Sequence, residues 1–240
     1  IRSVNMASSL LIADLHLASS EEDKTNLFIK FCQEQASKVD QLFILGDLFN
    51  TWLGDDLSIS SYQNVITHLK KLSTVTDVFV MTGNRDFLLG SNFEEASGCK
   101  LISEPYFLET NNKQYVLIHG DELCTDDVGY QQLKKILQHP ITKFIFLHLG
   151  KKLRLKISGQ LRKKSIQAQN YKSSEIMDVN QLAVDELMNK YPDSDLIHGH
   201  THRQDTHIGD CYTRYVLGDW SASQGNAIEI NTELNWLEIN

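Results

Sequence analysis

The chain has 240 residues, of which 41% are hydrophobic and 22% charged, and its formal net charge is −8. These values are typical of one globular α/β domain with an insertion. No apolar run approaches the roughly 20 residues needed to cross a bilayer, and no secretory-signal pattern opens the chain, so we expect neither a membrane span nor a leader. The four cysteines are scattered without a Cys-x-x-Cys pair, which predicts reduced, mostly buried thiols in a cytoplasmic protein.

Short apolar runs alternate with helix-like stretches along the first half of the chain. Apolar spacing predicts strands over 10–13, 42–45 and 78–81, and helices over 21–37 and 60–73. Further strands are predicted later in the chain, over 115–118, 196–197, 212–217, 227–230 and 236–239.

Residues 128–174 depart from this alternation of apolar strands and helices. They contain eleven Lys or Arg residues and no Asp or Glu, on a chain that is acidic elsewhere. Helical patterns occur over 130–137, 141–149 and 153–161, and a polar run follows over 163–174. We expect a helical insertion, or lid, over 128–174 in a core formed by residues 6–127 and 175–240. Its segregated positive charge indicates an anionic partner.

Five polar motifs each begin where a predicted strand ends. They are Asp14-Leu15-His16, Gly46-Asp47, Gly83-Asn84-Arg85-Asp86, His119-Gly120-Asp121 and Gly199-His200-Thr201-His202. Strand ends are where open α/β sheets place their ligands. Carboxylate, amide and imidazole groups without thiolates suit Mn²⁺, Fe²⁺ or Zn²⁺. Seven such groups are too many for one tetrahedral site and fit two ions that share a carboxylate.

Taken in order, these motifs resemble those of the calcineurin-like metallophosphoesterases. The resemblance implies an α/β sandwich of two β-sheets flanked by helices, and hydrolysis by a water molecule that two divalent ions activate. One ion would be held by Asp14, His16, Asp47 and His202, and the other by Asp47, Asn84, His119 and His200. The expected catalytic residues are Asn84, Arg85, His119 and His200. Arg85 stands where many members carry His, and we expect it to hold a phosphoryl oxygen.

Residues near the motifs admit plainer roles. His198 is outside the ligand pattern, so we expect it to be structural or to support a ligand. Asp86 and Asp121 are interpreted either as groups that orient ligands or as ordinary turn residues.

Longer segments resemble the UDP-2,3-diacylglucosamine hydrolases of lipid A biosynthesis. They are IADLHL, ILGDLFNTWLGDD, GNRDFLLG, HGDELCTDDVGYQ, IMDVNQ and IHGHTHR, spread over about residues 10–217. The resemblance implies Mn²⁺-dependent cleavage of UDP-2,3-diacylglucosamine to UMP and 2,3-diacylglucosamine 1-phosphate (lipid X), with water attacking the α-phosphorus. It implies a peripheral protein on the cytoplasmic face of the inner membrane.

The same resemblance implies a set of substrate contacts, which are Asn84, Arg85, Asp127, Tyr130, Ser165, Gln169, Lys172 and His200. Gln169 departs from the Asn expected there, which puts that contact in doubt.

The insertion suits such a substrate. Basic residues interleave with Leu153, Leu155, Ile157 and Leu161, as on helices that bind anionic membranes; they are Lys151, Lys152, Arg154, Lys156, Arg162, Lys163 and Lys164. Phe144, Ile145, Phe146 and Leu149 are expected to sheathe acyl chains. The plainer interpretation is an ordinary lid core with a solvated basic face.

Two other functions fit the motifs. The same ligands would serve another two-metal phosphodiesterase or phosphatase, acting on nucleotides, nucleic acid or phosphoproteins. Nucleic acid is disfavoured because the body of the chain is acidic and the basic segment lacks an aromatic stacking platform. A non-catalytic, metal-stabilised interaction module is the third reading, but such proteins usually lack ligands that are present here. No obligate protein partner is evident.

Overall fold

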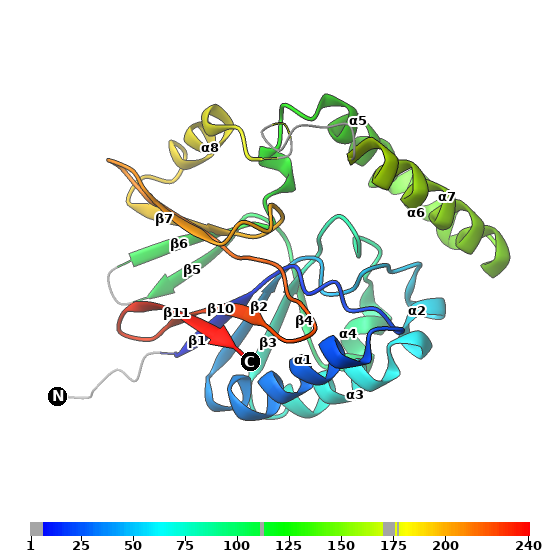
Figure 1. Cartoon of the computed structure of the whole chain (residues 1–240), viewed down its shortest axis with the longest axis horizontal. Helices are drawn as coiled ribbons and strands as arrows, with labels where there is room; N and C mark the ends of the chain where they lie inside the picture. Colours follow the sequence, from blue (N-terminus) through cyan, green and yellow to red (C-terminus); the bar gives the residue numbers. More distant parts are fainter. Residues whose placement is uncertain (1–6, 111–112, 170–175, 177) are drawn as a thin grey trace.

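Two β-sheets stack face to face, and helices cover both outer faces (Figure 1). The computed structural model describes residues 7–110, 113–169, 176 and 178–240. The first sheet has the order β11-β10-β1-β2-β3-β4, and the second has the order β5-β6-β7-β9-β8. Within the described ranges, no helix combines the length and apolar character that crossing a bilayer requires.

The first sheet is parallel at its centre. β1 (Ser9–Ile12), β2 (Gln41–Leu45), β3 (Asp77–Met81) and β4 (Lys100–Ile102) run in the same direction. β10 (Gly225–Ile230) pairs antiparallel with β1, and β11 (Leu234–Ile239) continues the edge. Four helices lie on its outer face: α1 (Glu22–Glu34), α2 (Asp55–Ser61), α3 (Gln63–Leu72) and α4 (Ser91–Ser97).

The second sheet combines three parallel strands with two antiparallel edges. β6 (Lys113–Leu117), β7 (Ser194–His198) and β9 (Thr213–Val216) are parallel. β5 (Tyr106–Thr110) and β8 (Asp205–Ile208) pair antiparallel at the edges. α8 (Gln181–Met188) covers the outer face of this sheet. Its side chains pack on Val116, Ile118 and Leu196.

Alternation along each strand divides the interior into layers. Leu10 and Ile12 face the helices of the first sheet, whereas Leu11 and Ala13 face the second sheet. The same split separates the two faces of β2 and of β3. Side chains of a strand point alternately to opposite faces, so continuous apolar runs are required where both faces are buried. This explains why the sequence reads LLI, LFIL and VFVM rather than as a polar–apolar alternation.

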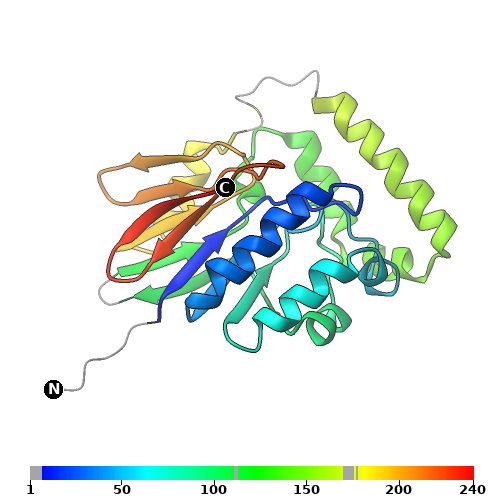
Figure 2. The ribbon, with the colours of Figure 1, turned by 60° about the horizontal axis from the view of Figure 1, so that its bottom comes forward.

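Residues 128–169 form three helices that extend beyond the carboxyl ends of β1–β3 (Figures 1 and 2). They are α5 (Val128–Leu137), α6 (Pro140–His148) and α7 (Lys151–Gln169), and helices occur at all three predicted segments. The Asp127 side chain caps α5 by accepting a hydrogen bond from Tyr130 N at 3.0 Å. α7 continues into the polar run that the sequence shows from residue 163.

Several elements differ from the sequence prediction. The helix predicted over 60–73 is two helices that meet at Tyr62. α4, β4, β5, β8 and α8 were not predicted, because most are too short to show a clear period. All four cysteines are free, and Cys211 alone among them is exposed.

Candidate metal centre and active site

The predicted ligands meet where the two sheets adjoin. Asp14, His16, Asp47 and Asn84 follow strands β1, β2 and β3 of the first sheet. The second sheet supplies the remaining three ligands from the ends of β6 and β7: His119, His200 and His202. The carboxyl ends of parallel strands share one edge, so the fold converts five separate sequence motifs into one cluster.

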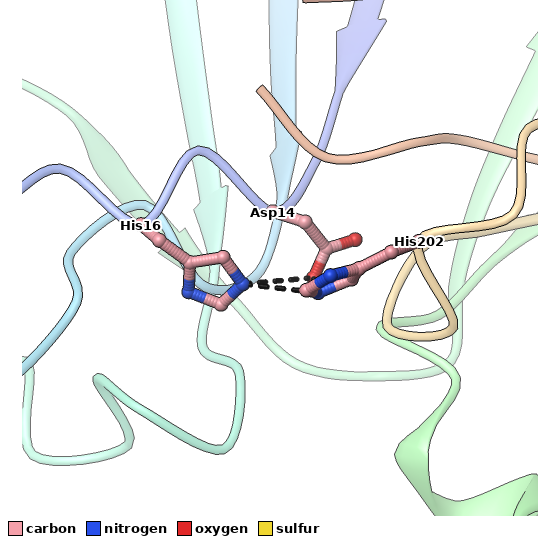
Figure 3. Close-up of side chains that lie close together, drawn as sticks. All are labelled: Asp14, His16 and His202. Carbon is pink, nitrogen blue, oxygen red and sulfur yellow. Dashed lines mark hydrogen bonds and ion pairs between the residues drawn. The ribbon is translucent and has the colours of Figure 1, made fainter. Parts of the chain in front are cut away.

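Asp14, His16 and His202 form the first group, and their side chains point toward one another (Figure 3). The Nε2 atoms of His16 and His202 are 3.0 Å apart. Asp14 Oδ1 lies 3.9 Å from His16 Nε2 and 3.6 Å from His202 Nε2. Three side chains that could each supply a metal-ligand atom therefore face one point.

Asp47 connects this group to the second. Its Oδ2 atom lies 3.7 Å from His16 Nδ1 and 3.9 Å from His119 Nε2. Asn84 Oδ1 lies 3.2 Å from both His119 Nε2 and His200 Nδ1. All seven predicted ligands thus lie in one continuous cluster, with Asp47 in the middle, as a bridging carboxylate would be.

The cluster carries features that a bound cation would satisfy. Asp14 Oδ1 and His16 Nδ1 are buried and have no hydrogen-bond partner among the described residues. Burial raises the pKa of Asp47 to about 8, opposed by the charge of His119 and assisted by the neighbouring carboxylates Asp86 and Asp14. His119 Nδ1 donates to Leu45 O at 2.9 Å, which leaves Nε2 facing the Asn84 oxygen at 3.2 Å. Divalent cations stabilise buried carboxylates, and this set of oxygen and nitrogen atoms suits them.

The backbone is strained at the same residues. The φ angle is positive at Asp14 (54°), His16 (48°), Asp47 (52°), His200 (68°) and His202 (59°). This left-handed conformation costs a non-glycine residue on the order of 1–3 kcal/mol, and it concentrates at functional sites. Strain at five of seven ligands is difficult to attribute to packing alone.

Two glycines permit the close approach of strand ends. A Cβ atom at Gly83 would collide with the carboxylate of Asp47, and one at Gly199 would collide with that of Asp14. These positions therefore require glycine because the ligand carboxylates lie against the backbone.

Asp86 and Asp121 have defined supporting contacts. Asp86 accepts hydrogen bonds from Gly83 N at 2.8 Å and Phe49 N at 3.2 Å, which joins the loops after β3 and β2. Asp121 accepts from Lys134 Nζ at 2.9 Å and from the Tyr130 hydroxyl. Burial opposes ionisation of Asp121, but His119, Lys134 and His200 outweigh it and hold its pKa at about 2. Both residues organise the surroundings of the ligands.

His198 has a structural environment. Its Nδ1 donates to Gly199 O at 2.8 Å, and its Nε2 lies 3.3 Å from the Arg214 guanidinium. Burial lowers its pKa to about 4, so the ring is neutral. It supports the backbone beside His200.

Two residues near the ligands were not anticipated. Asp219 Oδ2 lies 3.6 Å from His202 Nδ1, and Glu104 Oε2 accepts a hydrogen bond from His119 N at 2.8 Å. A signal for Asp219 was present, since Gly218-Asp219 follows the β9 strand as Gly46-Asp47 follows β2. Glu104 has no comparable signal.

A cavity of about 380 Å³ extends from the predicted ligand Asn84 between the core and α5–α7. Asn84, Arg85, Tyr130 and Ser165 line it. Arg85 Nε is buried without a hydrogen-bond partner among the described residues, and the Tyr130 ring stacks on His200 at 6.0 Å. Most of the remaining lining is apolar, from Trp52, Leu53, Phe87, Leu88, Leu133, Leu137, Ile145, Phe146, Leu149, Ile157 and Leu161.

Three other predicted substrate contacts are outside this lining or outside the described residues. Asp127 caps α5, and the cavity lining does not include it. Gln169 ends α7, with a side chain that lies outside the described part, and Lys172 lies outside the described residues altogether.

Two expectations for the insertion were wrong. Phe144 does not sheathe the cavity; it is 63% exposed and packs on His148. Arg154 does not belong to a solvated basic face, because it is only 4% exposed and pairs with Asp56.

Comparison with known proteins agrees with this geometry. Residues 8–204 match the family model described as calcineurin-like phosphoesterase, which confirms the predicted fold class. The UDP-2,3-diacylglucosamine hydrolase of Shewanella loihica is 41% identical over 227 residues, covering 94% of this chain and 93% of that protein. The protein of the same name from Histophilus somni is 41% identical over 220 residues, covering 91% of this chain and 94% of that protein.

Proposed function

The chain belongs to the calcineurin-like phosphoesterases and, within them, to the family of the UDP-2,3-diacylglucosamine hydrolases, and on this premise we propose that it cleaves the pyrophosphate bond of UDP-2,3-diacylglucosamine. Water and this substrate give UMP and 2,3-diacylglucosamine 1-phosphate. Both products carry phosphate, and the second carries two acyl chains. The proposal also places the reaction in lipid A biosynthesis.

One observation carries the substrate assignment: the cavity that begins at the proposed ligand Asn84 opens into an apolar chamber. Asn84 and Arg85 line it at the polar end, and Phe146, Ile157 and Leu161 line it beneath the insertion. A substrate with a charged pyrophosphate and long apolar substituents matches both ends. Burying each CH₂ group of an acyl chain contributes about 0.8 kcal/mol. A nucleotide alone would leave the apolar chamber unused.

The proposed metal ligands are the seven clustered side chains, with Asp47 shared between two sites and Mn²⁺ as the expected ion. When bound, such ions attract the phosphate oxygens and lower the pKa of a water molecule for attack on phosphorus. The Leu45 carbonyl holds the His119 ring so that Nε2 faces the centre. Backbone N–H groups hold Asp14 and Asp47 in a similar way.

Arg85 is the proposed phosphate contact of the chain itself. Its backbone N–H donates to Asp47 Oδ1 at 2.7 Å, which fixes the residue beside the bridging carboxylate. Its buried Nε has no hydrogen-bond partner among the described residues and can donate to a phosphoryl oxygen. Such a bond strengthens as negative charge develops on phosphorus. The leaving group is a phosphate that departs as an anion, so an Arg, which cannot donate a proton readily, is sufficient.

We also propose that the outer face of the insertion binds an anionic membrane, at the cytoplasmic face of the inner membrane. Exposed Lys151, Lys152 and Lys156 accompany Leu153 and Leu155, which are 45% and 50% exposed. On α6, Ile141 and Phe144 are each 63% exposed. Apolar groups next to lysines favour an interface between lipid tails and anionic headgroups.

Hydrolysis in ¹⁸O-labelled water tests the assignment and its chemistry together. With Mn²⁺ and the acylated substrate in mixed micelles, we expect one labelled oxygen in UMP and none in lipid X, because water attacks the α-phosphorus. Label in lipid X instead would place the attack on the other phosphorus. If neither product forms while a generic phosphodiester is hydrolysed, the protein is a different two-metal phosphoesterase.

A further inference from the structure

Three basic side chains of the insertion donate hydrogen bonds to loops of the core. Lys143 Nζ reaches Phe87 O at 3.0 Å, Arg154 reaches Leu53 O at 2.8 Å, and Arg162 reaches Thr51 Oγ1 at 3.2 Å. Phe87, Leu53 and Thr51 all line the cavity. The insertion is therefore attached along the rim of the cavity, to loops that follow the proposed ligands Asp47 and Asn84.

Arg154 makes more of these hydrogen bonds to the core than Lys143 or Arg162 does. Its guanidinium donates to both carboxylate oxygens of Asp56, at the start of α2, as well as to Leu53 O. Arg154 is 4% exposed, whereas the Asp56 side chain is 57% exposed. The pair raises the pKa of Arg154 and lowers that of Asp56. The charge on α7 is thus buried against a loop of the core and compensated there.

The contact joins two opposite walls of the cavity. Leu53, whose carbonyl accepts from Arg154, belongs to the core wall. Ile157 and Leu161, one and two turns along α7 from Arg154, belong to the insertion wall. A displacement of Arg154 would therefore separate the apolar surfaces that enclose the cavity.

We propose that Arg154 is a positioning residue for substrate selection: paired with Asp56, it holds α7 against the 51–56 loop and sets the apolar cavity that receives the acyl chains. This proposal deepens the proposed function and rests on it. A buried cation requires a compensating anion, so the closed arrangement depends on Asp56. Lysine would not substitute, because a single ammonium cannot reproduce the forked contact with both Asp56 oxygens and a carbonyl.

The first test measures attachment without any substrate. Amide hydrogen exchange of residues 151–165 should accelerate by at least about tenfold in Arg154→Gln and in Asp56→Asn. The double variant should exchange no faster than Arg154→Gln, because both changes remove the same contact. Lys163→Gln removes one charge from the exposed side of α7 and should exchange like the parent. Parental exchange in both single variants would overturn the proposal. Asp56→Asn changes a largely exposed side chain, so it provides a result even if Arg154→Gln does not fold.

The second test separates substrate selection from chemistry. In Asp56→Asn we expect KM for the acylated UDP-sugar to rise on the order of tenfold, with kcat for bis(p-nitrophenyl) phosphate within about twofold of the parent, since the metal ligands are untouched. Equal losses on both substrates would show a general structural defect and contradict the role in selection. Failure of the parent itself to cleave the acylated substrate would reject the proposed function, while the exchange measurement would still decide the attachment.

Discussion

In each of the two proposed ligand carboxylates, one oxygen is held by the backbone and the other faces the centre of the cluster. His200 N donates to Asp14 Oδ2 at 2.6 Å, and Arg85 N donates to Asp47 Oδ1 at 2.7 Å. Asp14 Oδ1 and Asp47 Oδ2 are the atoms that point at the histidines. Such prior orientation reduces the reorganisation that accompanies metal and substrate binding.

Arg85→Ala should lower kcat for the acylated substrate by about 10²–10³-fold, the usual effect of removing one donor to a charged transition state. The metal content, measured by inductively coupled plasma mass spectrometry, should stay at the parental value because no ligand is changed. Arg85→Lys should recover only part of the activity, since it restores the charge without the planar fork. Parental turnover in Arg85→Ala would contradict the role given to this residue.

At the scale of elements, the sequence located the strands that carry ligands. β1, β2, β3, β6 and β7 lie where apolar runs predicted them, because each is buried and ends at a polar motif. The short elements α4 and β4, with 7 and 3 residues, gave no usable period. The burial of Arg154 could not be predicted from sequence either, because its partner Asp56 is 98 residues away in the chain.

The candidate site was also predicted in part: its ligand cluster was predicted fully and its cavity lining incompletely. All seven predicted ligands lie together, since each motif marked a strand end and the fold aligned those ends. The cavity lining was predicted only in part: Ile145, Phe146 and Leu149 line the cavity, whereas Phe144 does not. Helical spacing identifies an apolar helix but does not decide which of two apolar faces is covered.

The outer face of α7 gives a prediction for membrane binding. Lys151→Ser, Lys152→Ser and Lys156→Ser combined should weaken co-sedimentation with anionic vesicles by on the order of 100-fold at low salt, at about 1 kcal/mol per lysine near such a surface. Arg154 stays unchanged because it is buried. The control combines Lys38→Ser, Lys71→Ser and Lys190→Ser, three exposed lysines outside the insertion, and should bind like the parent. Equal binding by both triple variants would count against a membrane face on α7.

For the whole molecule, the proposed ligand set links the two sheets. Asp14, His16, Asp47 and Asn84 come from one sheet and the three other histidines from the second, so bound metal would resist their separation. A ligand that binds only the folded state adds about 2.7 kcal/mol when present at 100 times its Kd. For a chain of this size, that amounts to a rise in Tm of about 5–10 °C.

The pH dependence of this stabilisation follows from two groups. Burial raises the pKa of Asp47 from 3.8 to about 8. Burial opposes the charge of His119, but Asp47, Asp121 and Asp14 outweigh it and raise its pKa from 6.5 to about 9. Between pH 6.5 and 8.5 the metal-free folded state therefore holds more protons than the unfolded state, and its stability falls as pH rises. Metal ions displace these protons when they bind, so the affinity of the protein for metal ions increases with pH.

We accordingly expect the difference in Tm between Mn²⁺-loaded and EDTA-treated protein to widen from pH 6.5 to 8.5, as measured by differential scanning calorimetry. Asp47→Ala removes the shared ligand and should lose most of the difference at every pH. A difference that narrows as pH rises would contradict the protonation states assigned to Asp47 and His119.

The most direct measurement is kcat/KM for UDP-2,3-diacylglucosamine compared with UDP-N-acetylglucosamine, under saturating Mn²⁺ in the same mixed micelles. The two substrates share the pyrophosphate that the metal centre would act on, and the second lacks the acyl chains. A cavity that encloses only a handful of CH₂ groups, at about 0.8 kcal/mol each, predicts a preference of at least about a thousandfold for the acylated substrate. Equal values for the two would show that the cavity beneath the insertion does not select acyl chains, and would contradict the account.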